Sequence, residues 1–505
     1  SYGGNHTYES DTSSACAADH PSPLCFPAES DLKQTVETTG TDPRDRITGS
    51  ILFMRHRASL PGAVCFIRTD PLLYGQLGPP LGIEFVIDPL NALLVLFITF
   101  IALCTSVYCG NFLQNKRWIQ TGGFFTLIGL LTVGLCGMTL TGDVFNLYVF
   151  LEVASISCYG LVALGGGKSI LAAFRYLLVG TVGASFYLIA VGILYSMTGT
   201  LNMADMALQL QGQLDSPLML LVCASLVAAF GIKMSIFPFH IWQPDAYSFT
   251  HPGASPLISG AMSKVPAFAM IRFFFFLFGI HHWIIDNTLL IIGILGAVGM
   301  IIGSIMALTQ TDFRRMLAYS SIAQLGYIAL GIGIGNYYGV AGSYLHILNH
   351  IFMKGGLFFV IGAIQYRFGI VDIRQFGQLH KKMPLTCFTL VIASLSMIGI
   401  PPAGGFFSKW YLMLGAMENH DIAYVIVLMA SSLLNAFYFL RVLEHIFISP
   451  ASGLKEKNPL PKHGELPLTI LIPVAAFGIG ILAMGFLNSN IVTHIIQPTL
   501  QGVFS

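Results

Sequence analysis

The sequence predicts an all-α polytopic membrane protein, and three observations support this fold class. The chain has 505 residues, of which 54% are hydrophobic and only 10% are charged, whereas a soluble protein carries about 25% charged residues. Twelve apolar runs follow one another from residue 88, and each is long enough to cross a bilayer as a helix of about 20 residues. The connectors between these runs are short, so the lipid bilayer is the expected solvent for most of the chain.

These runs divide the chain into three parts. Residues 1–77 are a polar and atypical N-terminal segment, expected to be extracytoplasmic or aberrant; residues 78–490 are the membrane domain, and residues 491–505 are a C-terminal tail. In chain order, the twelve predicted spans are 88–109, 118–140, 143–164, 171–198, 217–247, 254–280, 287–308, 316–335, 338–366, 385–416, 421–448 and 466–487.

Two of the predicted spans are unusually long and contain proline. The run 217–247 contains Pro238 and Pro244, and the run 385–416 contains the pair Pro401-Pro402. Proline removes a backbone donor and frees carbonyls in the preceding turn, and a bilayer tolerates this only where protein or water satisfies the freed groups. Broken helices in corresponding places of two halves are typical of inverted-repeat transporters.

Lysine and arginine predict the orientation, because cytoplasmic loops of membrane proteins are enriched in both. Of the connectors between the spans, only alternate ones contain lysine or arginine. These residues are Lys116 and Arg117; Lys168 and Arg175; Arg314 and Arg315; Arg367, Arg374, Lys381 and Lys382; and Lys455, Lys457 and Lys462. We therefore expect a multi-pass protein of the cell inner (cytoplasmic) membrane. Its cation-bearing connectors face the cytoplasm, and its N-terminal segment and C-terminus face outside.

Four lysines fall inside the predicted spans: Lys233, Lys264, Lys354 and Lys409. A lysine at a helix centre costs roughly 2.5–3.5 kcal/mol on insertion scales. The spans offer few carboxylates to compensate for them, and Glu152 is the clearest one. Lys233 and Lys409 also lie beside the two proline breaks. Buried ion pairs that serve only packing are the alternative, but the number and placement of the lysines favour an ion-translocating role.

His346, His350 and Lys354 are spaced four residues apart, so they lie on one face of one helix. They extend over about 12 Å of the helix axis, at roughly 1.5 Å per residue. Histidine titrates near neutral pH, and such a row can pass protons through intervening water. A metal site is the rival interpretation, but the neighbouring sequence supplies neither a catalytic glutamate nor a third ligand.

Other kinds of chemistry leave no motif in the sequence. The nine cysteines form no C-x-x-C pair, and there is no dinucleotide-binding, haem-attachment or iron–sulfur motif. We therefore expect no cofactor, no metal and no redox or hydrolytic site in this chain, although it could belong to a larger redox enzyme. The net charge of +1 gives no indication of nucleic-acid binding.

Five segments resemble the antiporter-like subunits shared by respiratory complex I, Mrp-type Na+/H+ antiporters and membrane-bound hydrogenases. They are GDVFNLYVFLEVASISCYGLVALG (142–165), GIKMSIFPFHIWQPDAYSFTHPGASPLISGAMSKVPAFAMIR (231–272), TDFRRMLAYSSIAQLGYIALG (311–331), LNHIFMKGGLFFVIGAI (348–364) and IGIPPAGGFFSKWYLMLGA (398–416). The resemblance covers about residues 78–490, and GDVFNLYVFLEV and HIFMKGGLF look most like the D-type member of the Mrp antiporters and its hydrogenase relatives.

This resemblance implies fourteen helices, two inverted five-helix repeats and a central hydrophilic axis. It makes Glu152 the family's glutamate on the fifth helix, Lys233 the lysine of the broken seventh helix and Lys264 the lysine of the eighth. His346, His350 and Lys354 fall on the eleventh helix, and Lys409 on the broken twelfth, where some members have glutamate. The family's first two helices are replaced here by the polar residues 1–77, so the twelve runs correspond to family helices three to fourteen.

We therefore expect a proton-conducting subunit of a multi-subunit Na+/H+ antiporter, which moves protons along Glu152, Lys233, Lys264, His346, His350, Lys354 and Lys409. The alternative is a proton-pumping subunit of NADH:quinone oxidoreductase or of a membrane-bound hydrogenase. The expected partners are H+, Na+ or K+, the lipid bilayer and other membrane subunits. A purely structural role is disfavoured by the cost of the buried lysines.

Overall fold

The computed structural model describes residues 69–73, 82–114, 118–450, 457–458 and 465–504. All of these lie in one compact unit, Val64–Ser505. Most of the predicted N-terminal segment, and with it the expected replacement of two helices, therefore lies outside the described residues.

Eleven helical segments of the described part are long and apolar enough to cross a membrane, which confirms the all-α polytopic fold class. They are α3 (Pro89–Leu113), α4 (Trp118–Leu140), α5 (Val144–Ala163), α6 (Lys168–Thr198), α8 (Pro217–Met234), the segment Ser255–Leu277, α12 (Trp283–Leu308), α13 (Phe313–Ile334), α14 (Tyr337–Phe368), α18 (Ile422–Phe447) and α19 (Leu468–Phe486). The remaining predicted span, 385–416, is divided between α16 (Pro384–Ile398) and α17 (Gly404–Glu418), two shorter helices.

Several shorter elements complete the described part. The segment Ser255–Leu277 consists of α10 (Ser255–Leu257), the π-helical turn η1 (Ile258–Met262), α11 (Lys264–Ile271) and the π-helical turn η2 (Arg272–Leu277). The connectors contain α7 (Met203–Gln209), η3 (Ile373–Gln375) and α15 (Leu379–Lys382), and α9 (Gln243–Phe249) follows the first helix break. The predicted tail is helical as far as Phe504, in α20 (Asn488–Ile491), η4 (Val492–Ile496) and α21 (Gln497–Phe504). One feature was not expected: strands β1 (Thr69–Leu73) and β2 (Glu84–Ile87) pair antiparallel.

Both predicted helix breaks are present, and each begins at a residue in the left-handed region. Helix α8 ends before Ser235, whose φ is +62°, and the helix resumes at α9 after Pro238. Helix α16 ends before Gly399, whose φ is +96°, and α17 begins after Pro401-Pro402. The left-handed residue turns the chain out of the helix, and the prolines that follow cannot supply the donors needed to continue it.

The two halves of the membrane domain pack in the same way. In the first half the most extensive helix pairings are α4 with α5 and α6 with α8, and in the second half they are α12 with α13 and α14 with α17. We count five helices from α4 in the first half and five from α12 in the second half. In each set the first helix pairs with the second, and the third helix pairs with the fourth, which is the broken one. This is the arrangement expected of two five-helix repeats.

The core lies around the helices that carry most of the predicted charges. Every residue of the most apolar window of α14 is buried, as are 94% of those in α13 and in the segment Ser255–Leu277. The peripheral helices, such as α18 and α6, bury only one face. Lys264, His346, His350 and Lys354 are therefore shielded from lipid by a surrounding layer of apolar helices.

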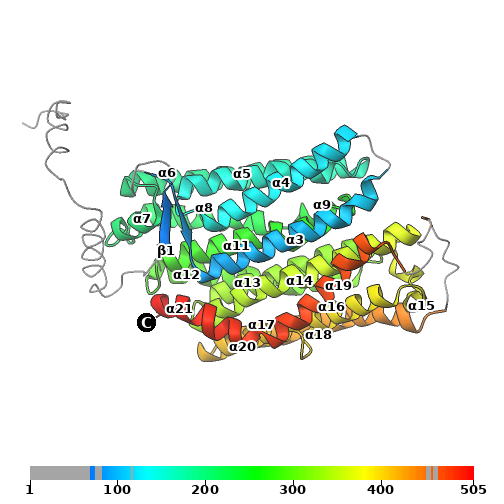
Figure 1. Cartoon of the computed structure of the whole chain (residues 1–505). Coiled ribbons are helices and arrows are strands. Elements are labelled where there is room, and N and C mark those ends of the chain that lie inside the picture. Colours follow the sequence, from blue (N-terminus) through cyan, green and yellow to red (C-terminus); the bar gives the residue numbers. More distant parts are fainter. Residues whose placement is uncertain (1–68, 74–81, 115–117, 451–456, 459–464, 505) are drawn as a thin grey trace, which may run out of the picture. The chain divides into compact units, whose positions relative to one another are not determined.

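The connectors form two groups at opposite ends of the helices. At one end, Gly142 donates to the Glu84 carbonyl and Met203 to the Gly142 carbonyl. At the other end, Arg175 and Arg315 both pair with Asp245 of α9, at 3.0 and 3.5 Å. In Figure 1, β1, α7 and α21 are at one end and α9 and α15 at the other. Arg175 and Arg315, which lie at this second end, are among the cations that the sequence assigns to the cytoplasm.

Candidate functional site

Glu152 and Lys233 come together at the end of the first broken helix. Lys233 is in the last turn of α8, and its side chain is only 1% exposed. Its Nζ lies 3.7 Å from Glu152 Oε1 of α5 and donates a 2.7 Å hydrogen bond to Ser155 Oγ, one turn further along the same helix. The Glu152 side chain is 27% exposed, so the pair extends from the core to the outer surface of the helix bundle.

Lys264 occupies an irregular stretch of its segment. It begins α11 directly after the π-helical turn η1, and its side chain is completely buried. The ammonium donates to the Ser259 carbonyl, and it lies 3.3 Å from Ser263 Oγ. Because a π-helical turn displaces a carbonyl from the regular ladder, the backbone itself supplies an acceptor for this lysine.

The predicted row on α14 is present, and its three side chains are completely buried. The His346 ring lies between Ser408 Oγ, at 2.9 Å from Nδ1, and Gln324 Oε1, at 3.0 Å from Nε2. The His350 ring lies 5.8 Å from that of His346, centroid to centroid. Lys354 donates to the Leu317 carbonyl, at 2.8 Å, and to Ser320 Oγ.

Lys409 turns back toward the second helix break. Its Nζ donates to the carbonyls of Met397 and Ile398, at 2.8 and 2.9 Å, which are the last residues of α16. It also lies 4.7 Å from the centre of the Tyr327 ring. A cation at this place is favoured by the unpaired carbonyls and the negative end of the helix dipole, so the broken helix provides the lysine with its partners.

The structure connects the second-half residues through Tyr327 of α13. The Tyr327 ring stacks against His346 at 5.6 Å and also faces the Lys409 ammonium. Helix α14, which carries His346, His350 and Lys354, packs against η1 and against α11, whose first residue is Lys264. The four groups from Lys264 to Lys354 therefore form one buried cluster, and Tyr327 joins it to Lys409.

Among the described residues, Glu152 is the only carboxylate within ion-pairing distance of the four buried lysines. The other three lysines are held by carbonyls, hydroxyls and an aromatic face. Neutral partners can accommodate either form of a lysine, whereas a permanent ion pair would hold it charged. This arrangement therefore suits groups that gain and lose protons.

Sequence reasoning missed most of the polar partners: Ser155, Ser320, Gln324, Tyr327, Ser408 and Ser432. One signal was available, because Ser320 and Gln324 are four residues apart in an apolar helix and so share a face. The two ring nitrogens of His346 face Ser408 and Gln324. No group of three potential metal-ligating side chains occurs among the described residues.

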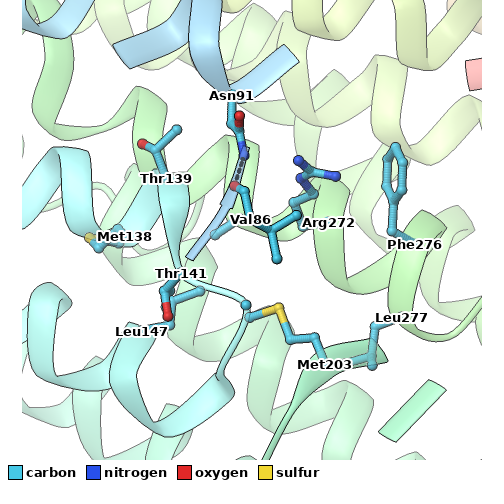
Figure 2. A pocket seen from close by; sticks show the side chains of 12 residues that line it. Val86, Asn91, Met138, Thr139, Thr141, Leu147, Met203, Arg272, Phe276 and Leu277 are labelled. Carbon is cyan, nitrogen blue, oxygen red and sulfur yellow. Dashed lines mark hydrogen bonds between the residues drawn. The ribbon is translucent and has the colours of Figure 1, made fainter. Parts of the chain in front are cut away.

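A separate pocket contains Arg272, which is not one of the predicted site residues (Figure 2). Asn91, Thr139, Thr141 and Met203 line it together with Arg272, and Asn91 donates to the Val86 carbonyl at 2.6 Å. The Arg272 guanidinium pairs with Asp88. It also lies against the Phe268 and Phe276 rings, at 5.2 and 4.7 Å. None of the seven predicted site residues lines this pocket.

Comparison with known proteins agrees with the resemblance read from the motifs. Residues 141–435 match a family described as NADH:quinone oxidoreductase/Mrp antiporter, TM. The N-type subunit of NADH-quinone oxidoreductase from Desulforudis audaxviator is 45% identical over 447 residues, which are 87% of this chain and 89% of the relative. The D-type subunit of the Na(+)/H(+) antiporter from Alkalihalophilus pseudofirmus is 32% identical over 429 residues, 85% of each chain.

The fold also has solved counterparts. A chain of the membrane-bound sulfane sulfur reductase, an archaeal respiratory membrane complex, superposes with a TM-score of 0.78 at 27% identity, over 89% of this chain and 88% of that one. The family match covers more than half of the sequence, and the two curated relatives match most of it. This chain is therefore a multi-pass membrane protein that belongs to the NADH:quinone oxidoreductase/Mrp antiporter family of membrane subunits.

Proposed function

We propose that this chain conducts protons across the membrane along Glu152, Lys233, Lys264, His346, His350, Lys354 and Lys409. The observation that carries the proposal is the burial of these groups: the last six are at most 8% exposed, yet three of the four lysines have only neutral partners among the described residues. A fixed structural charge would need a counterion, whereas a proton-exchanging group needs partners that tolerate both of its forms.

The Glu152–Lys233 pair is the proposed switch. An opposite charge stabilises the charged form of its neighbour, so a close Glu152 carboxylate keeps Lys233 protonated. Ser155 Oγ, which already accepts a hydrogen bond from Lys233 at 2.7 Å, can hold the amine when the pair separates. A change in this pairing would then release a proton toward Lys264, the row on α14 and finally Lys409.

We also propose that the chain works inside a multi-subunit complex. Glu152 is the most exposed of the seven residues, and its face of α5 lies at the surface of this chain. A carboxylate against lipid is costly, so a neighbouring membrane subunit is the favoured contact. The relatives support this proposal: one is a subunit of NADH-quinone oxidoreductase, and another is a subunit of a Na(+)/H(+) antiporter.

Two sources of driving force are compatible with such a subunit. The sequence motifs favour exchange with Na+ or K+, as in an antiporter, and the 32% identity to the D-type antiporter subunit supports this. The 45% identity to the N-type subunit of NADH-quinone oxidoreductase favours a redox-driven pump. Because this identity is higher than that to the antiporter subunit, it supports the redox-driven pump more strongly than the sequence motifs did. In either case the cation-bearing connectors are proposed to face the cytoplasm of an inner-membrane protein.

The test is proton transport in inside-out vesicles that contain the assembled complex, with a pH-sensitive dye as the readout. Lys233→Ala and Glu152→Ala are expected to reduce transport at least tenfold. Ser157→Ala is the matched control, because Ser157 is also buried in α5 and its side chain, within the described part of the chain, bonds only to the Val153 carbonyl of its own helix. If both variants transport protons like the unmodified complex while assembling normally, the proposed axis is wrong.

The same vesicles distinguish the two driving forces. A redox pump acidifies the vesicles only when its electron donor and acceptor are added. An antiporter releases the stored proton gradient when Na+ or K+ is added without any electron donor. Dye recovery on cation addition alone would favour the antiporter.

A further inference from the structure

The break between α8 and α9 contains an unusual number of buried polar atoms. Ser235 Oγ, His240 Nδ1 and both amide atoms of Gln243 have no hydrogen-bond partner among the described residues. The Tyr176 ring of α6 stacks on Trp242 at 3.8 Å, and its hydroxyl lies beside the Cys158 thiol. Ser235, His240 and Gln243 follow Lys233 in the chain, so the first break is polar but incompletely satisfied by the described residues.

Gln243 is the clearest of these groups. Its side chain is fully buried and faces the Tyr247 hydroxyl, but neither its amide oxygen nor its amide nitrogen has a hydrogen-bond partner within 3.5 Å among the described residues. A buried amide without partners destabilises a fold, and leucine would occupy a similar volume without that penalty. A water molecule is a suitable partner, because an amide can donate to one water and accept from another.

Tyr247 continues the polar path from Gln243. It is one turn further along α9, so the two side chains share a face of this helix. The Tyr247 hydroxyl lies 3.4 Å from Ser263 Oγ, and Ser263 Oγ lies 3.3 Å from the Lys264 ammonium. At the other end of the path, the Trp242 indole donates to the Ile232 carbonyl beside Lys233, at 3.0 Å. The N-cap residue of α9 therefore contacts the backbone next to Lys233, and Tyr247 of α9 contacts Ser263 next to Lys264.

We propose that Gln243 and Tyr247 form the relay that carries protons, through bound water, between Lys233 and Lys264. Gln243 keeps its protonation state and orients the water. The Tyr247 hydroxyl accepts a proton on its oxygen as it gives its own proton toward Ser263 and Lys264, so it is neutral before and after each transfer. This relay rests on the proposed proton-conducting function and adds to it one positioning residue, Gln243, and one proton-transferring residue, Tyr247.

The experiment measures proton transport and thermal stability of the assembled complex. Gln243→Leu and Tyr247→Phe are expected to lower transport about tenfold or more. Gln243→Leu should melt at the same or a higher temperature than the unmodified complex, because it removes an unpaired buried amide. A loss of transport without a loss of stability is an outcome that a merely structural role does not produce.

Two further variants complete the set. Gln243→Asn keeps the amide and is expected to retain more transport than Gln243→Leu. Ser248→Ala is the matched control, since Ser248 is buried on the same short helix but bonds to the Pro244 carbonyl at 2.6 Å; its transport should be unchanged.

Tyr247→Phe decides the question if Gln243→Leu fails to assemble, because it removes one oxygen and keeps the ring. Normal transport by Tyr247→Phe, together with loss of transport in Lys233→Ala, overturns the relay but leaves the proposed function intact. Normal transport by Lys233→Ala overturns the proposed function itself.

Discussion

Lys409 illustrates how a single cationic side chain is accommodated in this membrane domain. Its ammonium is saturated by the carbonyls of Met397 and Ile398, by Ser432 Oγ and by the face of Tyr327. Two of these partners exist only because α16 stops at the break. The lysine therefore has a structural task, which is to satisfy a broken helix end, and a proposed chemical task, which is to exchange protons.

The two tasks of Lys409 can be separated by substitution. Lys409→Ala leaves two carbonyls unpaired and is expected to cost about 1–3 kcal/mol of stability for a buried acceptor, together with proton transport. Lys409→Gln can still donate from its amide but cannot exchange a proton. We expect it to recover much of the melting temperature while transport stays absent. Normal transport in Lys409→Gln would remove Lys409 from the axis.

At the scale of the element, the second break depends on Gly399. Its φ of +96° is in a region that residues with a Cβ rarely adopt. A Cβ at this position would also lie only 3.1 Å from Lys409 Cδ and 3.5 Å from Lys409 Nζ. The glycine thus permits the turn and also leaves room for the lysine that satisfies it.

Gly399→Ala is accordingly expected to lower the stability of the complex by roughly 1–2 kcal/mol from backbone strain and to reduce transport by displacing Lys409. The control is Gly192→Ala in α6, where a Cβ would have no neighbour within 4 Å and alanine favours the helix by about 0.5–1 kcal/mol. Melting temperature and vesicle transport measure both effects. An unchanged Gly399→Ala complex would contradict this account of the break.

On the scale of the whole molecule, ion pairs join segments that are distant in the sequence. Asp88 begins α3 and accepts a hydrogen bond from the Asn91 backbone N–H as its cap, while its carboxylate also pairs with Arg272, 184 residues away. The Arg272 guanidinium is held further by two phenylalanine rings. This contact fixes α3 against the segment that also carries Lys264.

Asp88→Asn tests the ion pair alone, because asparagine is an equally good helix cap. Removing one partner of a buried pair leaves an uncompensated charge and costs about 3–5 kcal/mol, so we expect a clearly lower melting temperature. The double variant Asp88→Asn with Arg272→Met should recover part of that loss, since no unpaired charge remains. If the single variant melts like the unmodified complex, the pair does not hold these segments together.

Much of the fold was predictable because its causes are local. The lengths of the apolar runs predicted where helices cross the membrane, and the prolines predicted both helix breaks. The free-energy cost of inserting a lysine into a bilayer identified Lys233, Lys264, Lys354 and Lys409 as candidate site residues. The β1–β2 pairing was not predicted, since it requires contact between segments separated by a turn rather than a periodic pattern. The residues 1–68 lie outside the described structure, and the expectations for them stay predictions.

By itself the sequence determined that this is a multi-pass membrane protein with ionisable groups beside two broken helices, because hydropathy, charge and proline act residue by residue. Only the tertiary structure decided which groups meet. It gave Lys233 both Glu152 and Ser155, turned Lys409 back onto the end of α16, and left the Gln243 amide buried without a partner among the described residues. The physical reason is that a buried polar group is defined by what surrounds it in space, and in this protein those surroundings come from helices that are far apart in the sequence.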